Sequence, residues 1–97
     1  MGMPNIRLKL DKSTGHGCFP PSLPVAASMN VFCNGIPEVR VGDAYMTHCC
    51  PSKGCHQGTA LTGAVKTFTN GRLVHTAGGA IDCGDVASNG SPNVFSG

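Results

Sequence analysis

Glycine and proline interrupt this chain so often that they exclude ordinary helices. Of its 97 residues, 14 are glycine and 7 are proline, more than globular domains usually carry. No window of 11 residues combines helical spacing of apolar side chains with freedom from both residue types. We therefore expect a mainly β fold, in which short strands are joined by many tight turns.

The chain is short and poor in large apolar side chains. Aromatic residues make up 5% of the sequence, and tryptophan is absent. A hydrophobic core of this size is marginal unless a disulfide or a metal ion supports it. We interpret residues 1–97 as a single small domain that depends on such a cross-link.

The charge pattern excludes several classes of partner. The net charge is +2, and the seven basic residues are scattered along the chain, unlike the clustered patch of a nucleic-acid-binding protein. No apolar run is long enough for a transmembrane helix, and residues 1–12 lack the apolar core and cleavage site of a signal peptide. We expect a protein made in the cytoplasm without a signal peptide and without a nucleic-acid partner.

Three segments of the sequence resemble one another. They are SMNVFCNG (28–35), GAVKTFTNG (63–71) and GSPNVFSG (90–97), and each contains one phenylalanine and ends in glycine. The repeat indicates either a β-rich domain with similar hairpins or a pseudo-threefold object with one such strand on each side. Core packing is the simplest role for Phe32, Phe68 and Phe95, and a place at the base of the object is the alternative.

Two of these segments contain a hairpin signal. Asn34-Gly35 and Asn70-Gly71 favour type I′ turns, which require positive φ at both positions. The expected strand pairs are residues 30–33 with 36–41, and 67–69 with 72–76. The third segment ends with the chain, so we expect a lone strand that pairs with another part of the domain. Residues 1–12 form either a first strand or a partner contact.

Candidate metal ligands gather in three turn-rich clusters. The first cluster lies in GHGCFPP (15–21), the second in THCCPSKGCHQG (47–58) and the third in DCGD (82–85). Zinc prefers a tetrahedral set of nitrogen and sulfur ligands. Glycines and prolines around these residues would hold the ligands in place before the metal binds.

The spacing of the six cysteines leaves three interpretations open. It matches no standard zinc-finger pattern, so a zinc site, disulfides and buried free thiols all remain. Cys33 is expected to be a small buried residue on a strand, and Cys18 either the same or a thiol that supports the site. His75 lies apart from the clusters, and we expect a structural histidine there.

A catalytic site finds little support in the sequence. A cysteine nucleophile needs a histidine within hydrogen-bonding distance, but neighbouring residues such as Cys55 and His56 point to opposite faces of a strand. Asp43, Asp82 and Asp85 could orient a histidine, but each is also typical of an ordinary turn. We expect that the protein is not an enzyme; the alternative is a small zinc- or thiol-dependent effector enzyme.

Several motifs together resemble a known family. NGIPEVRVGD (34–43) is similar to the Pro-Ala-Ala-Arg segment that names the PAAR-repeat proteins. TGHGCFPP, GDAYMTHCCP, CHQG, DCGD and NGSPNVFSG also resemble the family pattern, and the resemblance extends from about residue 14 to residue 97. The second repeat, NGRLVHTAGG, lacks the expected proline, arginine and aspartate.

The resemblance implies a small cone-shaped domain of short β-hairpins with pseudo-threefold repeats, stapled by a metal near its apex. Such a domain caps the trimeric β-helical spike of a contractile injection machine, either a type VI secretion system or a contractile phage tail. One copy would sit on each trimer and sharpen it for membrane puncture. An effector cargo and a transient contact with the target membrane would accompany that role.

The resemblance also implies a site. The family holds one structural zinc ion per chain, commonly through three histidines and one cysteine. The matching positions are His16, His48, His56 and Cys83, with Cys50 as an alternative to His48 because it directly precedes Pro51.

Overall fold

The computed structural model describes residues 2–97 and consists of short β-strands. No helix occurs among these residues, and hence none that is long and apolar enough to cross a membrane. This confirms the mainly β prediction. The strands are β1 (Met3–Pro4), β2 (Phe32–Cys33), β3 (Ile36–Pro37), β4 (His48–Cys50), β5 (Gly54–His56), β6 (Phe68–Thr69), β7 (Arg72–Leu73) and β8 (Phe95–Ser96).

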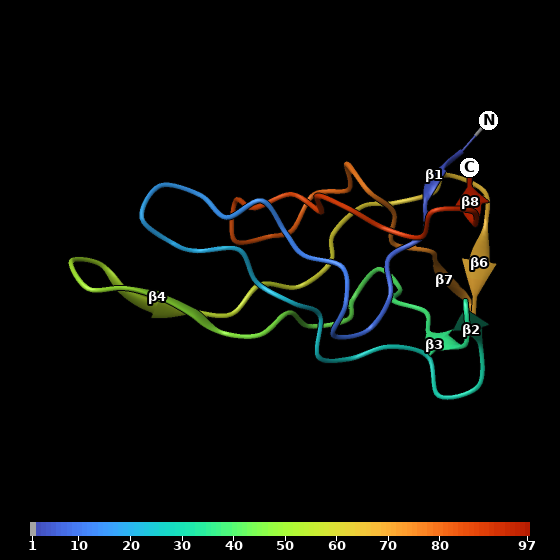
Figure 1. Cartoon of the computed structure of the whole chain (residues 1–97), viewed down its shortest axis with the longest axis horizontal. Helices are drawn as coiled ribbons and strands as arrows, with labels where there is room; N and C mark the ends of the chain where they lie inside the picture. Colours follow the sequence, from blue (N-terminus) through green and yellow to red (C-terminus); the bar gives the residue numbers. More distant parts are fainter. Residues whose placement is uncertain (1) are drawn as a thin grey trace.

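The strands form four antiparallel pairs in an elongated molecule. Hairpins join β2 to β3, β4 to β5 and β6 to β7, whereas β1 pairs with β8 from the other end of the chain. The principal extents are 39 × 25 × 21 Å. Figure 1 shows the β4 hairpin at one end of the long axis and the other three pairs, with both termini, at the opposite end. We call the latter the hairpin end.

Both Asn-Gly turns form as predicted. Asn34 and Gly35 have φ values of 56° and 78°, and Asn70 and Gly71 have values of 53° and 78°, as a type I′ turn requires. The paired strands are only two residues long, shorter than predicted. They end early because the following residues pair with other segments; Glu38, for example, bridges to Arg7.

The third repeat pairs with the N-terminal segment. Phe95 lies opposite Pro4, and Ser96 lies opposite Met3. The strand predicted at residues 90–97 therefore pairs with a strand near the N-terminus. The strand ends at Pro4, well short of residue 12, and the chain turns at Lys9, which has a φ of 54°.

Three backbone hydrogen bonds form a closed ring among buried residues. The Val39 amide donates to Ile6 O at 3.0 Å, the His75 amide donates to Val39 O at 3.0 Å, and the Ile6 amide donates to His75 O at 3.1 Å. The side chains of all three residues are fully buried. The ring therefore ties together one segment from each of the three strand pairs at the hairpin end.

His75 is a structural histidine, as predicted. Its Nδ1 lies 2.7 Å from Thr62 O, and its Nε2 lies 2.9 Å from the Tyr45 hydroxyl. Because a carbonyl only accepts, Nδ1 carries the proton and Nε2 accepts from the tyrosine. Both ring nitrogens are satisfied in the interior.

The prediction that the three phenylalanines belong to the core is wrong. Phe32, Phe68 and Phe95 are 57%, 62% and 54% exposed. The residue after each of them points inward instead, because neighbours on a strand alternate between faces; these residues are the small Cys33, Thr69 and Ser96.

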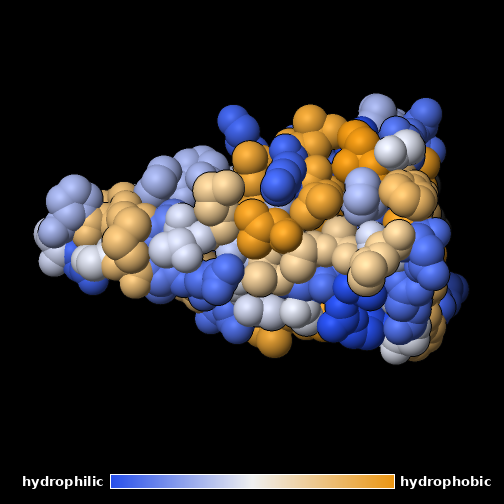
Figure 2. All heavy atoms as spheres, turned by 90° about the horizontal axis from the view of Figure 1, so that it is seen from below, coloured by the Kyte–Doolittle hydropathy of each residue, from blue (hydrophilic) through white to orange (hydrophobic). Residues whose placement is uncertain are grey.

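The core itself consists of two small clusters. One contains Ile6, Val39, Ala77 and Ala87, and the other contains Tyr45, Ala60 and Ile81. Figure 2 shows that the strongly hydrophobic residues of one face gather on the wider part of the molecule. The narrower end must be held together by other interactions.

Candidate metal centre

The β4–β5 hairpin places two histidines on one face. His48 lies opposite His56, and Cys49 lies opposite Cys55. Residues directly opposite each other share a face, while neighbours alternate, so the histidine pair and the cysteine pair point to opposite sides. This hairpin was not predicted from the sequence, although Pro51, which follows β4, and Gly54, which begins β5, are typical turn residues.

All four predicted ligands come together at this hairpin. The candidate ligand atoms of His16, His48, His56 and Cys83 lie within 4.8 Å of one another. His48 Nε2 is 2.7 Å from His56 Nε2 and 4.0 Å from Cys83 Sγ. A tetrahedral zinc ion keeps such atoms roughly 3.3–3.6 Å apart, given bond lengths of about 2.0–2.3 Å. The two distances bracket that range, so the residues fit a metal ion after small movements.

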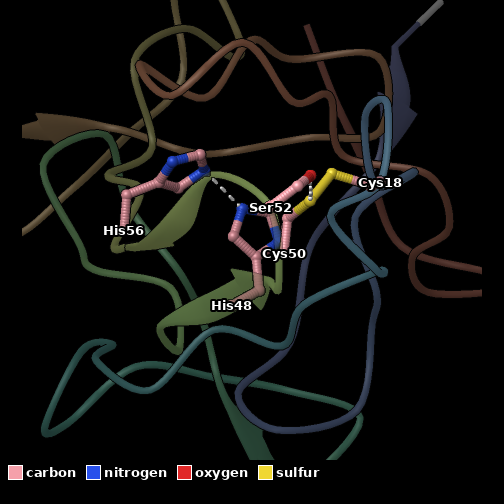
Figure 3. Close-up of a disulfide and its surroundings, with 5 residues drawn as sticks. All are labelled: Cys18, His48, Cys50, Ser52 and His56. Atoms are coloured by element: carbon pink, nitrogen blue, oxygen red, sulfur yellow. Dashed lines mark hydrogen bonds between the residues drawn. A yellow bond between two sulfur atoms is a disulfide. The ribbon is translucent and has the colours of Figure 1, made fainter.

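His48 is held in the tautomer that binds a metal. Its Nδ1 lies 2.7 Å from Pro20 O, so Nδ1 must donate, and the lone pair of Nε2 faces His56 Nε2. Figure 3 shows the rings of His48 and His56 turned toward each other, next to the disulfide between Cys18 and Cys50. The carbonyl that orients His48 belongs to the stretch GHGCFPP.

The same stretch forms a tight loop that presents His16. The His16 amide donates to Phe19 O at 3.1 Å, and the Phe19 amide donates to His16 O at 2.9 Å. Gly15 has a φ of 76°, and a Cβ there would lie 2.7 Å from Phe19 O, so this position requires glycine. The His16 ring then stacks on His56, with centroids 5.0–5.1 Å from the rings of Phe19 and His56.

The cysteines divide among all three interpretations left open by the sequence. Cys18 pairs with Cys50, and Cys49 pairs with Cys55. Cys33 is a free, buried thiol on a strand, as predicted, and Cys83 is free beside the histidines.

Two expectations about individual cysteines are therefore corrected. Cys50 is not an alternative ligand to His48, because its sulfur is bonded to Cys18. Cys18 is neither a buried small residue nor a free supporting thiol. Cysteine connectivity cannot be deduced from spacing, so no signal in the sequence identified these pairs.

The surroundings of His56 favour its neutral form. Desolvation, and then the nearby His48 and His16, lower the pKa of His56. Neutral imidazole is the form that binds a metal ion. The lowered pKa therefore favours the metal-binding form of His56.

A carboxylate lies next to the cluster. Burial raises the pKa of Asp85, but the Ser13 and Thr14 hydroxyls and the Val86 amide outweigh it, so the net pKa lies below the ordinary value. Asp85 is thus an anion close to His16, whose Nδ1 is 4.0 Å from Asp85 Oδ1. From the sequence, Asp85 is either a carboxylate that could orient a histidine or an ordinary turn residue.

The arrangement can therefore hold one metal ion with three nitrogen atoms and one sulfur atom, all supplied by the chain. No protein-family model and no curated protein matches this sequence.

Proposed function

We propose that this chain is a PAAR-type spike tip, which caps a trimeric β-helical spike of a contractile injection machine and sharpens it for membrane puncture. The observation that carries the proposal is the set of three exposed phenylalanines at the hairpin end, one from each of three strand pairs. One copy of the chain would cap one trimer.

Backbone contacts support a pseudo-threefold arrangement behind these phenylalanines. The ring of hydrogen bonds runs from Ile6 to His75, from His75 to Val39 and from Val39 back to Ile6. The bridges between segments follow the same order: Arg7 with Glu38, Arg40 with Val74, and Thr76 with Asn5. Three similar segments related in this way would give one chain the symmetry that a homotrimeric partner presents.

The surface at the hairpin end suits a protein partner. Phe32, Phe68 and Phe95 are all more than half exposed, and Met29 and Val65 are 94% and 83% exposed. Met29 and Val65 each lie three residues before one of these phenylalanines. Fully burying one phenylalanine contributes about 1.5–3 kcal/mol. The short strands of the hairpins would continue the open strand edges of a trimeric β-helix by strand addition.

Zinc is the metal we assign to the four-residue cluster, as one structural ion per chain. Three histidines and one cysteine match the ligand preference of zinc, and four protein ligands fill its coordination sphere. Catalytic zinc keeps one position open, so this set favours a structural role over the alternative of a zinc-dependent effector enzyme. At the narrow end of the cone, the ion would replace a hydrophobic core and make the point rigid.

The proposed role sets where the protein acts. It would be made in the cytoplasm, assembled on the spike, and delivered across the target envelope in transient contact with the membrane. An effector cargo could travel with it. The role requires neither a nucleic-acid partner nor catalytic residues.

Native mass spectrometry of this chain mixed with its cognate trimeric spike tests the proposal. We expect a species of three spike chains, one copy of this chain and one zinc ion. A free chain with one zinc ion would contradict the capping role and leave the metal site. A chain that binds no zinc would contradict the metal assignment.

A matched pair of variants tests which surface binds the spike. Replacing Phe32, Phe68 and Phe95 together by serine should abolish the complex, because the contact loses its apolar groups. Replacing Met46 and Leu61 by serine removes side chains that are 47% and 55% exposed outside the hairpin strands, and should leave the complex intact.

A further inference from the structure

Two buried polar atoms beside the metal cluster lack hydrogen-bond partners. They are His16 Nδ1 and Asp85 Oδ2; neither has a partner with hydrogen-bond geometry within residues 2–97, although the nearby Ser13 hydroxyl lowers the pKa of Asp85. The Asp85 side chain is 1% exposed, and His16 Nδ1 lies 4.0 Å from Asp85 Oδ1. A buried polar atom without a hydrogen-bond partner costs free energy, so a hydrogen bond between the His16 ring and the Asp85 carboxylate would remove a cost that both groups carry.

Asp85 is fixed in this position by its own contacts. Its Oδ1 accepts from the Thr14 hydroxyl at 2.7 Å and from the Val86 amide at 3.1 Å. The turn that precedes it is closed by hydrogen bonds from the Ile81 amide to Asp85 O and from the Gly84 amide to Ile81 O. This turn, DCGD, therefore delivers both the Cys83 thiol and the Asp85 carboxylate to the cluster.

We propose that Asp85 is a positioning residue for the metal site: its carboxylate accepts a hydrogen bond from His16 Nδ1–H and leaves Nε2 of that ring for the metal ion. This rests on the zinc binding proposed above. Metal-ligating histidines almost always donate their other nitrogen to a carbonyl or carboxylate. His48 already has such a partner in Pro20 O, and Asp85 is the group placed to serve His16.

The balance of charge points the same way. A zinc ion bound by one thiolate and neutral histidines keeps a net charge of +1. Buried charge is costly unless an opposite charge lies close by. Asp85 supplies that negative charge next to the ligand set without occupying a coordination position.

Zinc affinity in matched variants tests this role. Asp85→Asn keeps the shape of the side chain but replaces an acceptor by an amide. Loss of such a partner typically weakens metal binding by about 10–100-fold, and we expect that loss in a competition titration with a chromophoric chelator. The control is Asp82→Asn, in the same turn, where the carboxylate accepts from the Thr59 amide at 2.9 Å. Its affinity should stay at the native value.

The nitrogen resonances of the native chain loaded with zinc provide a second readout that needs no variant to fold. We expect His16 to carry its proton on Nδ1 and to bind zinc through Nε2, and Co²⁺ in place of zinc should give a tetrahedral absorption spectrum. Coordination through His16 Nδ1, or native affinity in Asp85→Asn, would overturn the role of Asp85 and leave the zinc site. A native chain that binds no zinc would overturn both the role of Asp85 and the zinc site.

Discussion

At the scale of single residues, His75 links stability to pH. Burial lowers its pKa, and the hydrogen bond to the Thr62 carbonyl only partly opposes that effect. The unfolded chain therefore binds a proton near the ordinary pKa of about 6.5, whereas the folded chain does not. By linkage, the stabilising contribution of neutral His75 is present above that pH and is lost as the pH falls below it.

We predict that the free energy of unfolding of the metal-free chain falls between pH 7 and pH 5. Each pH unit between the pKa of His75 in the unfolded chain and its lower pKa in the folded chain costs at most about 1.4 kcal/mol. Urea unfolding at a series of pH values measures this. In His75→Gln the slope should be smaller, and an equal slope in both proteins would assign the effect to another group.

A glycine next to the metal cluster gives a second prediction. A Cβ at Gly58 would lie 2.5 Å from Ile81 Cγ2 and 2.8 Å from Cys83 Sγ. Gly58→Ala should therefore displace the Cys83 thiol and weaken zinc binding at least about tenfold, as for a misplaced ligand, in the same chelator competition.

Gly71→Ala is the matched control. Its Cβ would meet no atom within 4 Å, but the φ of 78° is unfavourable for alanine. It should lower stability by about 1 kcal/mol and leave zinc affinity unchanged. Equal zinc affinity in Gly58→Ala and the native chain would disprove the steric argument.

At the scale of elements, two disulfides hold the ligand-bearing segments together. Cys49–Cys55 connects β4 to β5 across a sequence separation of 6, and Cys18–Cys50 connects the His16 loop to β4 across a separation of 32. Both restrict the unfolded chain, and the longer loop restricts it more. The hairpin end contains neither disulfide.

We predict unequal costs for removing the two disulfides. Cys18→Ser with Cys50→Ser should lower the free energy of unfolding by about 4 kcal/mol, and Cys49→Ser with Cys55→Ser by about 2 kcal/mol, on loop-closure grounds. Denaturant unfolding of both double variants, with zinc bound, measures the difference. A larger cost for the shorter loop would mean that local packing outweighs chain entropy.

Some elements of the fold follow from the local sequence, and others do not. The Asn34-Gly35 and Asn70-Gly71 turns were predicted because positive φ is a local requirement. The exposure of Phe32 could not be predicted in this way, since it depends on which neighbour faces the small core. The four clustered ligands followed from a family pattern, whereas the disulfide pairs depend on the three-dimensional path of the chain.

At the scale of the whole molecule, the proposed metal site lies at the β4–β5 end, and only one of the two core clusters contacts it, through Cys83. None of the three candidate histidine ligands belongs to a core cluster or to the hydrogen-bonded ring. Of the four candidate ligands, Cys83 packs against one core cluster. Loss of the metal should therefore disturb one end more than the other.

We predict that a strong chelator lowers the melting temperature while the hairpin end keeps its fold. Binding to the native state alone stabilises it in proportion to the logarithm of the metal concentration. Amide hydrogen exchange should rise in residues 15–21 and 47–58 and change little in β2, β3, β6 and β7. Melting that is unaffected by chelation would contradict a structural role for zinc.

The pairing of β1 with β8 makes the domain suitable for circular permutation. The three strand pairs at the hairpin end differ in connectivity, because two of them are closed by an Asn-Gly turn and the third is formed by the two chain ends (Figure 1). A circular permutant, with the ends joined by a short linker and the chain opened between Asn34 and Gly35, would keep every strand pair. The fold of this domain thus depends on the strand pairs and not on which of the three connections between them is cut.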